Sequence, residues 1–179
     1  MPKCYFIRNN SKMKSTKEAF IEILSDYQGI LHKVSLVYFK NEADREDNLQ
    51  EIIYQLWKSF SSLKNHNSIG SWIYAVSINT SISRIKMASR IEYRETIPEL
   101  PDQSDIIEKI SMNESLQLLI NAIYNLDEVD KSIMLLYLEE KSYDEIAEIV
   151  GISKSYVGVR INRAKEILKK SLNKYSHGK

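Results

Sequence analysis

The sequence predicts an all-α protein with two small helical domains joined by a flexible linker. The 179-residue chain contains only five Gly and three Pro, so long segments have no residue that breaks a helix. Apolar residues in these segments recur every three to four positions, which is the period of a helix face and not of a strand. Residues 91–112 interrupt the pattern with two prolines and many carboxylates, a composition that is typical of a linker.

Four apolar segments are expected before the linker. Ser15 or Thr16 is suited to cap the first, and residues 30–39 form a second. The third begins near Ala43, and its apolar residues share one helix face: Leu49, Ile52, Ile53, Leu56, Trp57 and Phe60. A fourth helix is expected over about residues 68–90, with Trp72 in its apolar stripe and more suited to the core than to stacking on a base.

After the linker, the capping signals predict a second series of helices. Asp127 is expected to cap one helix, and Ser142 with Glu145 fits the capping box of a short helix that ends at Gly151. Ser153 is expected to cap the last, long helix. A short helix, a glycine turn and a long helix are typical of the helix-turn-helix unit, whose second helix enters the major groove of DNA.

The last helix has two chemically different faces when its residues are placed at about 100° intervals. The inner face carries Val157, Ile161, Ala164 and Leu168. The outer face carries Ser155, Val159, Asn162 and Arg163, flanked by Tyr156 and Arg160. Arg163 is suited to bond guanine, Asn162 to bond adenine and Val159 to touch a thymine methyl group. The same pattern also fits two packed helices with a solvated basic face, and Gly158 has no evident role in either interpretation.

Charge is distributed in three blocks that the net charge of +1 conceals. Residues 1–90 carry 13 Lys/Arg against 8 Asp/Glu, residues 91–152 carry 4 against 15, and residues 153–179 carry 8 against 1. The basic C-terminal block favours a polyanionic partner such as DNA. The acidic middle block is expected to mask the basic parts and to weaken DNA binding by the free chain.

Several classes of protein are disfavoured. A single cysteine cannot build a disulfide framework and suggests a reducing compartment. The sequence contains no apolar run of membrane-spanning length and no signal-peptide core, so we expect a cytoplasmic protein without membrane insertion. We find no nucleophile–base pair, Gly-rich phosphate loop or metal-ligand cluster in the sequence, so we expect neither an enzyme nor a cofactor or metal.

Three blocks of the sequence carry a resemblance to a known family. The first is residues 126–170, with the features Leu126, Glu145-Ile146-Ala147, Gly151, Ile152, Ser153, Val157, Arg160 and Arg163-Ala164. The others are residues 44–57, DREDNLQEIIYQLW, and residues 71–86, SWIYAVSINTSISRIK. The first block resembles region 4 of the extracytoplasmic-function (ECF) sigma factors, a group within the sigma-70 family. The second block resembles their region 2.2, and the third resembles their regions 2.3 and 2.4. Unrelated helix-turn-helix regulators would not share the N-terminal blocks.

The resemblance implies a bacterial sigma factor that binds core RNA polymerase and directs promoter-specific transcription initiation. Its implied parts are an N-terminal extension (1–15), region 2 (16–90), the acidic linker (91–112), region 4 (113–175) and a tail (176–179). The implied partners are promoter DNA and the beta-prime clamp helices and beta flap of the polymerase, with an anti-sigma factor as a further candidate. The alternative is a stand-alone helix-turn-helix transcriptional regulator, which would bind an operator without polymerase.

The resemblance also assigns individual residues. Core polymerase binding falls to Asp44, Asp47, Gln50 and Glu51. Contacts with the minus-10 element fall to Lys64, Asn65, Asn67, Asn79, Arg84 and Lys86. Contacts with the minus-35 element fall to Lys154, Ser155, Tyr156, Val159, Arg160, Asn162 and Arg163. Three positions depart from the family pattern, because Ala75, Ile78 and Gly158 stand where basic residues are common.

Overall fold

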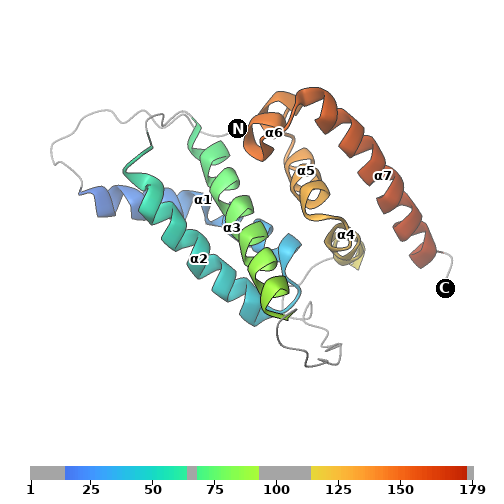
Figure 1. Cartoon of the computed structure of the whole chain (residues 1–179), viewed down its shortest axis with the longest axis horizontal. Coiled ribbons are helices and arrows are strands. Elements are labelled where there is room, and N and C mark those ends of the chain that lie inside the picture. The colour runs from blue at the N-terminus through green and yellow to red at the C-terminus, as the bar shows by residue number, and fades with distance from the viewer. Residues whose placement is uncertain (1–14, 64–67, 93–113, 177–179) are drawn as a thin grey trace.

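The computed structural model describes residues 15–63, 68–92 and 114–176, and these form seven helices and no strand. The helices are α1 (Thr16–Tyr38), α2 (Glu42–Phe60), α3 (Ile69–Glu92), α4 (Glu114–Tyr124), α5 (Glu128–Leu138), α6 (Tyr143–Val150) and α7 (Lys154–Ser176). Figure 1 shows α1, α2 and α3 as one bundle and α4 to α7 as a second bundle beside it. The predicted all-α fold with two helical domains is therefore confirmed for this part of the chain.

The first domain begins with a fully formed capping box. The hydroxyl of Ser15 accepts from the backbone N–H of Glu18 at 3.3 Å, and the Glu18 carboxylate accepts from the backbone N–H of Ser15 at 2.9 Å. The two apolar segments predicted on either side of Gly29 form the single helix α1. A helix accepts an interior glycine at a cost of about 1 kcal/mol, and burial of Leu31 and Val34 on the far side holds the second half in place.

An aromatic core and a buried set of side-chain hydrogen bonds hold the three helices of this domain together. Phe20 of α1 makes edge contacts with Trp57 and Phe60 of α2, at centroid distances of 5.0 and 5.3 Å. Trp72 of α3 packs on the same cluster, as predicted. Elsewhere in the domain, the buried amide of Asn48 donates to the hydroxyls of Ser35 and Ser81, at 2.9 Å each, and so connects α2 to α1 and α3.

The capping predictions for the second domain are confirmed. Asp127 accepts from the backbone N–H of Asp130 at 2.9 Å, and Ser142 forms a capping box with Glu145. Gly151 ends α6 with a φ of 76°, a left-handed conformation that favours glycine. Ser153 caps α7 by accepting from the backbone N–H of Tyr156. The predicted inner face of α7 is buried, with Val157, Ile161, Ala164 and Leu168 in the core.

The two domains are in contact. α3 packs against α6, and the C-terminal half of α1 packs near α4 and α5. One continuous set of buried side chains includes Val34 and Ile78 of the first domain together with Ile123 and Ile133 of the second. The helix-turn-helix unit therefore lies against the first domain.

Candidate nucleic-acid and polymerase interfaces

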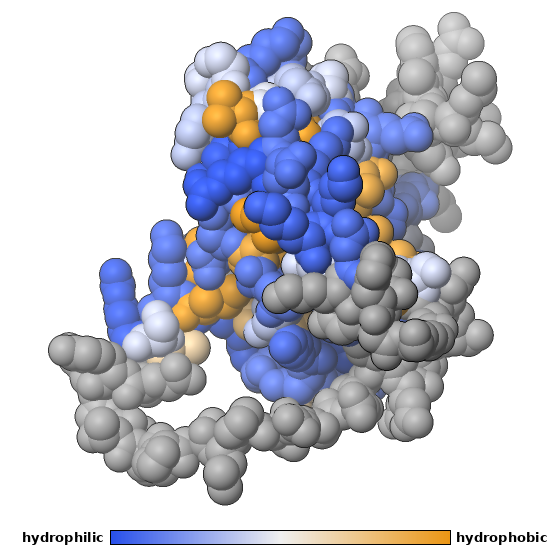
Figure 2. Space-filling view, turned by 90° about the vertical axis from the view of Figure 1, so that its right-hand side faces the viewer, coloured by the Kyte–Doolittle hydropathy of each residue, from blue (hydrophilic) through white to orange (hydrophobic). Residues whose placement is uncertain are grey.

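The outer face of α7 is open to solvent. Ser155, Val159, Asn162 and Arg163 are all exposed, and Val159 is 62% exposed. The cap at Ser153 and the turn at Gly151 set the start of the helix, while the buried inner face fixes its rotation about its axis. Figure 2 views the molecule from the side on which α7 lies, and hydrophobic residues form only separate small patches on this mainly hydrophilic face. These four side chains are thus placed where a DNA groove could reach them.

Arg160 does not belong to that open face. Its Nε donates to Asp130 at 2.6 Å, and its Nη2 donates to both oxygens of Asp127 at 2.6 and 2.7 Å. The remaining nitrogen, Nη1, donates to the Tyr156 hydroxyl at 3.1 Å. With its side chain only 11% exposed, Arg160 connects α7 to the start of α5. This geometry corrects the expectation that its guanidinium is available to hold a phosphate.

The two carboxylates around Arg160 differ in environment. Asp130 is 1% exposed, and burial raises the pKa of its carboxyl although the Arg160 hydrogen bond opposes the change. Burial acts in the same direction on Asp127, but the backbone N–H of Asp130 and the Arg160 guanidinium outweigh it and lower the pKa of that carboxyl. A buried carboxylate without a cationic partner would be strongly destabilising. We therefore expect the stability of this domain to depend on Arg160 in this position.

Lys154 is held much more weakly. Its Nζ lies 2.7 Å from Oδ2 of Asp144, and both side chains are well exposed. Exposed ion pairs of this kind contribute about 0–1 kcal/mol, so a phosphate could displace the carboxylate. The acidic middle block thus pairs with two predicted DNA contacts, Arg160 and Lys154, but it leaves the outer face of α7 uncovered.

Gly158 faces the neighbouring helix. A Cβ atom added at this position would lie 3.5 Å from Cε2 of Tyr143, which is an ordinary contact distance. The Tyr143 ring of α6 therefore lies over the backbone of α7 at this point. An approach of DNA to the glycine backbone is not supported, because the side of the helix at which a side chain would project is taken by the ring.

The predicted polymerase-binding residues lie along α2. Asp47 and Gln50 are exposed, while Asp44 and Glu51 are partly buried. Asp47 accepts from Nη2 of Arg84 at 2.9 Å, and Asp44 lies 3.9 Å from the same nitrogen. The structure therefore brings Arg84, a predicted minus-10 contact, onto the carboxylates that were expected to bind polymerase.

The other minus-10 candidates lie on α3 and in the loop before it. Asn79 and Lys86 are exposed on α3 and, being seven residues apart, share one face of the helix. The loop candidates Lys64, Asn65 and Asn67 lie outside the described residues. The neighbouring Ile78 is buried in the core cluster that both domains share, and Ala75 is partly buried against it. An arginine in place of Ile78 would put an unpaired charge in that core, which gives a physical reason for the departure from the family pattern at this position.

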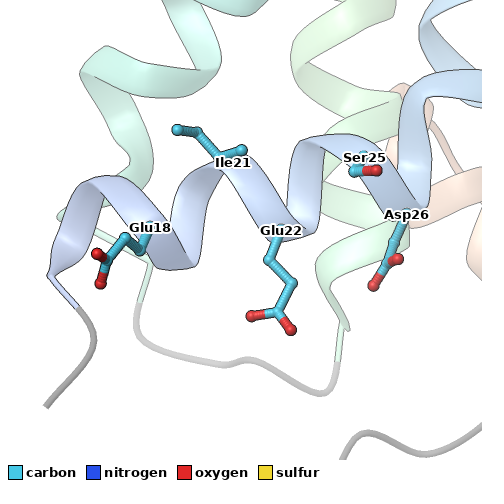
Figure 3. Close-up of a pocket in the computed structure, with 5 residues that line it drawn as sticks. All are labelled: Glu18, Ile21, Glu22, Ser25 and Asp26. Carbon is cyan, nitrogen blue, oxygen red and sulfur yellow. The ribbon is translucent and has the colours of Figure 1, made fainter. Parts of the chain in front are cut away.

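The outer surface of α1 offers a different chemistry. Glu18, Ile21, Glu22, Ser25 and Asp26 line a shallow hollow, and Figure 3 shows the carboxylate side chains of Glu18, Glu22 and Asp26 extending away from the helix axis. Three carboxylates would repel a phosphate backbone. This surface is therefore excluded from the candidate DNA interface.

Comparisons with known proteins agree with this layout. The family model of sigma-70 region 2 matches residues 23–91, and the model of sigma-70 region 4 matches residues 116–168. The RNA polymerase sigma factor SigV of Bacillus subtilis is 27% identical over 166 residues, which cover 91% of this chain and 96% of that protein. The ECF RNA polymerase sigma factor SigW of the same organism is 25% identical over 178 residues, covering 89% and 91%.

Two solved structures share the fold. The sigma factor RpoE from Bartonella quintana, in complex with the anti-sigma factor NepR, has a TM-score of 0.70 at 18% identity and covers 87% of this chain and 97% of its own. CnrH in complex with the cytosolic domain of CnrY has a TM-score of 0.58, also at 18% identity, and covers 88% and 89%. Within the described ranges, none of the helices combines the length and apolar character needed to span a membrane.

Proposed function

We propose that this chain, which belongs to the sigma-70 family as an ECF sigma factor, binds core RNA polymerase and directs it to specific promoters. The observation that carries the proposal is the presence of both family regions, in family order, over residues 23–91 and 116–168. A stand-alone helix-turn-helix regulator needs only the second region. The exposed carboxylate face of α2 would also have no role in such a protein.

Region 4 supplies the contact with the minus-35 element. The outer face of α7 enters the major groove, where Arg163 and Asn162 bond base edges and Val159 touches a methyl group. Ser155, Tyr156 and Lys154 contact the sugar–phosphate backbone near the N-terminus of α7, which itself favours a phosphate. Arg160 is left out of this set, because all three of its nitrogens are bonded within the domain.

Region 2 supplies the contact with polymerase and with the minus-10 element. The carboxylates and amide of α2, which are Asp44, Asp47, Gln50 and Glu51, dock on the beta-prime clamp helices, where exposed charges set orientation and encounter rate. Asn79 and Lys86 on α3, with Lys64, Asn65 and Asn67 in the loop before it, contact the unstacked minus-10 strand. Arg84 can join them when polymerase takes over its two carboxylate partners.

The remaining partners follow from the same role. The protein acts without catalysing a reaction, works in the cytoplasm where the polymerase is, and contacts the beta flap through region 4. Each of the two solved structures described above holds a second protein, an anti-sigma factor in the case of RpoE. An anti-sigma factor is accordingly a candidate regulator of this chain.

Reconstituted transcription tests the proposal. Core RNA polymerase is incubated with genomic DNA fragments, with and without the protein, and the 5′ ends of the transcripts are sequenced. We expect a set of start sites that appears only when the protein is added. The proposal fails if the protein adds no start sites. Tight and sequence-specific binding of DNA by the protein without polymerase would instead support a stand-alone helix-turn-helix regulator.

A further inference from the structure

We infer that Asn48 is a positioning residue that fixes α2, the helix proposed to bind polymerase, against α3, the helix proposed to contact the minus-10 element, and that one buried water completes its hydrogen bonds. The inference rests on the proposed function for its effect on transcription. The water and the hydrogen bonds belong to the first domain itself and can be examined without polymerase or DNA.

A polar cluster lies where the three helices of the first domain meet. Its members are Ser35 of α1, Asn48 of α2, and Ser77 and Ser81 of α3, and none of them is more than 1% exposed. Nδ2 of Asn48 donates to the hydroxyls of Ser35 and Ser81 at 2.9 Å each. The Ser81 hydroxyl donates in turn to the backbone carbonyl of Ser77 at 2.9 Å. One side chain of α2 is thus bonded to both neighbouring helices.

These bonds determine which way the Asn48 amide points. A serine hydroxyl carries one proton, and the proton of Ser81 is used on the carbonyl of Ser77. Ser81 therefore accepts from Asn48, so the group that faces it is the NH2 of the amide. The Oδ1 atom is consequently directed away from Ser81, because exchanging the two amide atoms would bring two acceptors together.

Two buried polar atoms of the cluster have no protein partner in the described part of the chain. They are Oδ1 of Asn48 and Oγ of Ser77. A buried polar atom that gives up its hydration without gaining a hydrogen bond is destabilising, and ordered water satisfies many such atoms in folded proteins. The amide oxygen needs a donor, while the hydroxyl can accept or donate. A water molecule serves both, and the neutral side chains of the cluster favour it over an ion.

The geometry of α3 brings the two atoms within reach of one water. Ser77 and Ser81 are four residues apart on α3, which is roughly 6 Å along the axis at about 1.5 Å per residue. The Asn48 amide lies against Ser81, at one end of this interval. Two hydrogen bonds of about 2.8 Å through one water span roughly 5.6 Å. A water between the Asn48 oxygen and the Ser77 hydroxyl thus bridges about one turn of α3.

The cluster lies behind the two surfaces that are proposed to contact polymerase and DNA. Asn48 follows Asp47 on α2, while Ser77 and Ser81 stand on either side of Asn79 on α3. Positions two residues apart on a helix point about 200° apart, so the buried serines fix the rotation at which α3 exposes Asn79. The two helices pack side by side (Figure 1), and the bonds of Asn48 fix α2 in the same way.

An amide selects one arrangement of the two helices more strictly than an apolar side chain. Apolar contacts have no direction, so a helix can shift along its neighbour with little loss. A buried amide keeps its hydrogen bonds in one register only. Asn48 therefore sets the spacing between the carboxylates of α2 that dock on polymerase and the side chains of α3 that contact the minus-10 strand.

A crystal structure of the full-length chain, at a resolution that shows ordered water, tests the site. We expect one water within about 2.6–3.2 Å of both Asn48 Oδ1 and Ser77 Oγ. In Ser77→Ala, which keeps both bonds between Asn48 and the other serines, that water should be lost or displaced. The site is refuted if Asn48 Oδ1 and the Ser77 hydroxyl bond each other directly, or if the water is unchanged in Ser77→Ala.

Asn48→Leu tests the positioning role. Leucine has a similar volume, and both bonded serines can still donate to carbonyls of their own helices, so we expect a thermal midpoint equal to or above that of wild type. Polymerase affinity should stay within about twofold, because the exposed residues of α2 are unchanged. The fraction of promoter opened by saturating holoenzyme, measured by permanganate reactivity of unpaired thymines, should fall about three- to thirtyfold, since displacing a group by roughly 1 Å can cost about a hundredfold.

The matched control is Leu56→Met, a volume-conserving change at a buried position of the same helix. We expect this variant to match the wild type in both polymerase affinity and promoter opening. Normal opening by Asn48→Leu, or a loss of opening that follows a loss of thermal stability, would overturn the positioning role. Failure of the wild-type chain itself to open any promoter, with the water present in the crystal, would count against the proposed function instead.

Discussion

The two helices proposed to contact DNA differ in what covers them. α7 exposes its whole outer face, with Val159 at 62% exposure, while its inner face forms the core of its own domain. α3 exposes Asn79 and Lys86 on one side, but Tyr74 and Ile78 on another side are buried in the cluster shared with region 4. The outer face of α7 is therefore exposed to solvent in the free chain, whereas one side of α3 is covered by the second domain. Exposure of a DNA-contacting helix thus depends on domain arrangement as well as on amphipathicity.

The same contrast exists within α7, between two arginines three residues apart. Arg163 is exposed, whereas Arg160 is bonded to Asp127, Asp130 and Tyr156. Both have the same charge and occur in the same basic segment. Arg163 is available for DNA, whereas Arg160 connects α7 to α5 within the domain that presents Arg163.

The largest effect is expected from Arg160→Ala. The substitution leaves Asp130 as a buried carboxylate without its cationic partner, a change that costs about 3–5 kcal/mol when a buried pair is broken. Urea unfolding should show this loss in the free energy of unfolding. Arg163→Ala is the matched control and should stay within about 0.5 kcal/mol of the wild type, as exposed substitutions do. Equal stability of the two variants would remove the distinction between the arginines.

Arg163→Ala is expected to act on DNA instead. If its guanidinium bonds a base edge, binding of polymerase holoenzyme should weaken by about 1–3 kcal/mol at one position of the upstream element. The measurement is competition among promoter fragments that differ by single base pairs. A loss of equal size on every fragment would make Arg163 a phosphate contact.

Gly158→Ala sharpens the comparison between the outer and inner sides of α7. Because the new methyl group would meet the Tyr143 ring at an ordinary contact distance, we expect the variant to gain about 1 kcal/mol of stability from helix propensity. Promoter binding should not change. A clear loss of promoter affinity without loss of stability would show that DNA approaches this glycine after all.

The smallest effect concerns the capping box of α6. The backbone N–H and hydroxyl of Ser142 lower the pKa of Glu145 in the folded chain. A lowered pKa stabilises the fold above the unfolded value, and this stabilisation disappears as pH falls through the folded value. Glu145→Gln should therefore be less stable than wild type by under about 1 kcal/mol at neutral pH, since the residue is partly exposed. In thermal unfolding, this difference should begin to shrink as pH falls below the ordinary pKa of 4.5 and should vanish below the lowered pKa of the folded chain. A difference that grows on acidification would contradict the assignment.

Local signals allowed much of each domain to be predicted. The caps at Asp127, Ser142 and Ser153 depend on residues three positions apart, and the inner face of α7 depends on one helix period. Contacts over longer separations had no comparable signal. Arg160 meets partners about thirty residues earlier, and nothing in its own neighbourhood distinguishes it from Arg163.

The contact between the domains could not be predicted from the sequence either. Apolar residues such as Val34 and Ile78 have the same periodicity whether they face their own domain or another. The one available sign was the apolar character of Ala75 and Ile78, where the family commonly has basic residues. Gly158 was ambiguous for a related reason, because Tyr143, which covers it, lies on a different helix.

The most direct test of the central claim is transcription from a promoter library with randomised upstream sequence. Core polymerase with the wild-type chain should select two sequence blocks upstream of each start, and Arg163→Ala should relax one position in the block farther from the start. Polymerase without the chain should select neither block. Selection that does not depend on the chain, or relaxation in the nearer block, would contradict the assignment of α7 to the minus-35 element and of this protein to promoter selection.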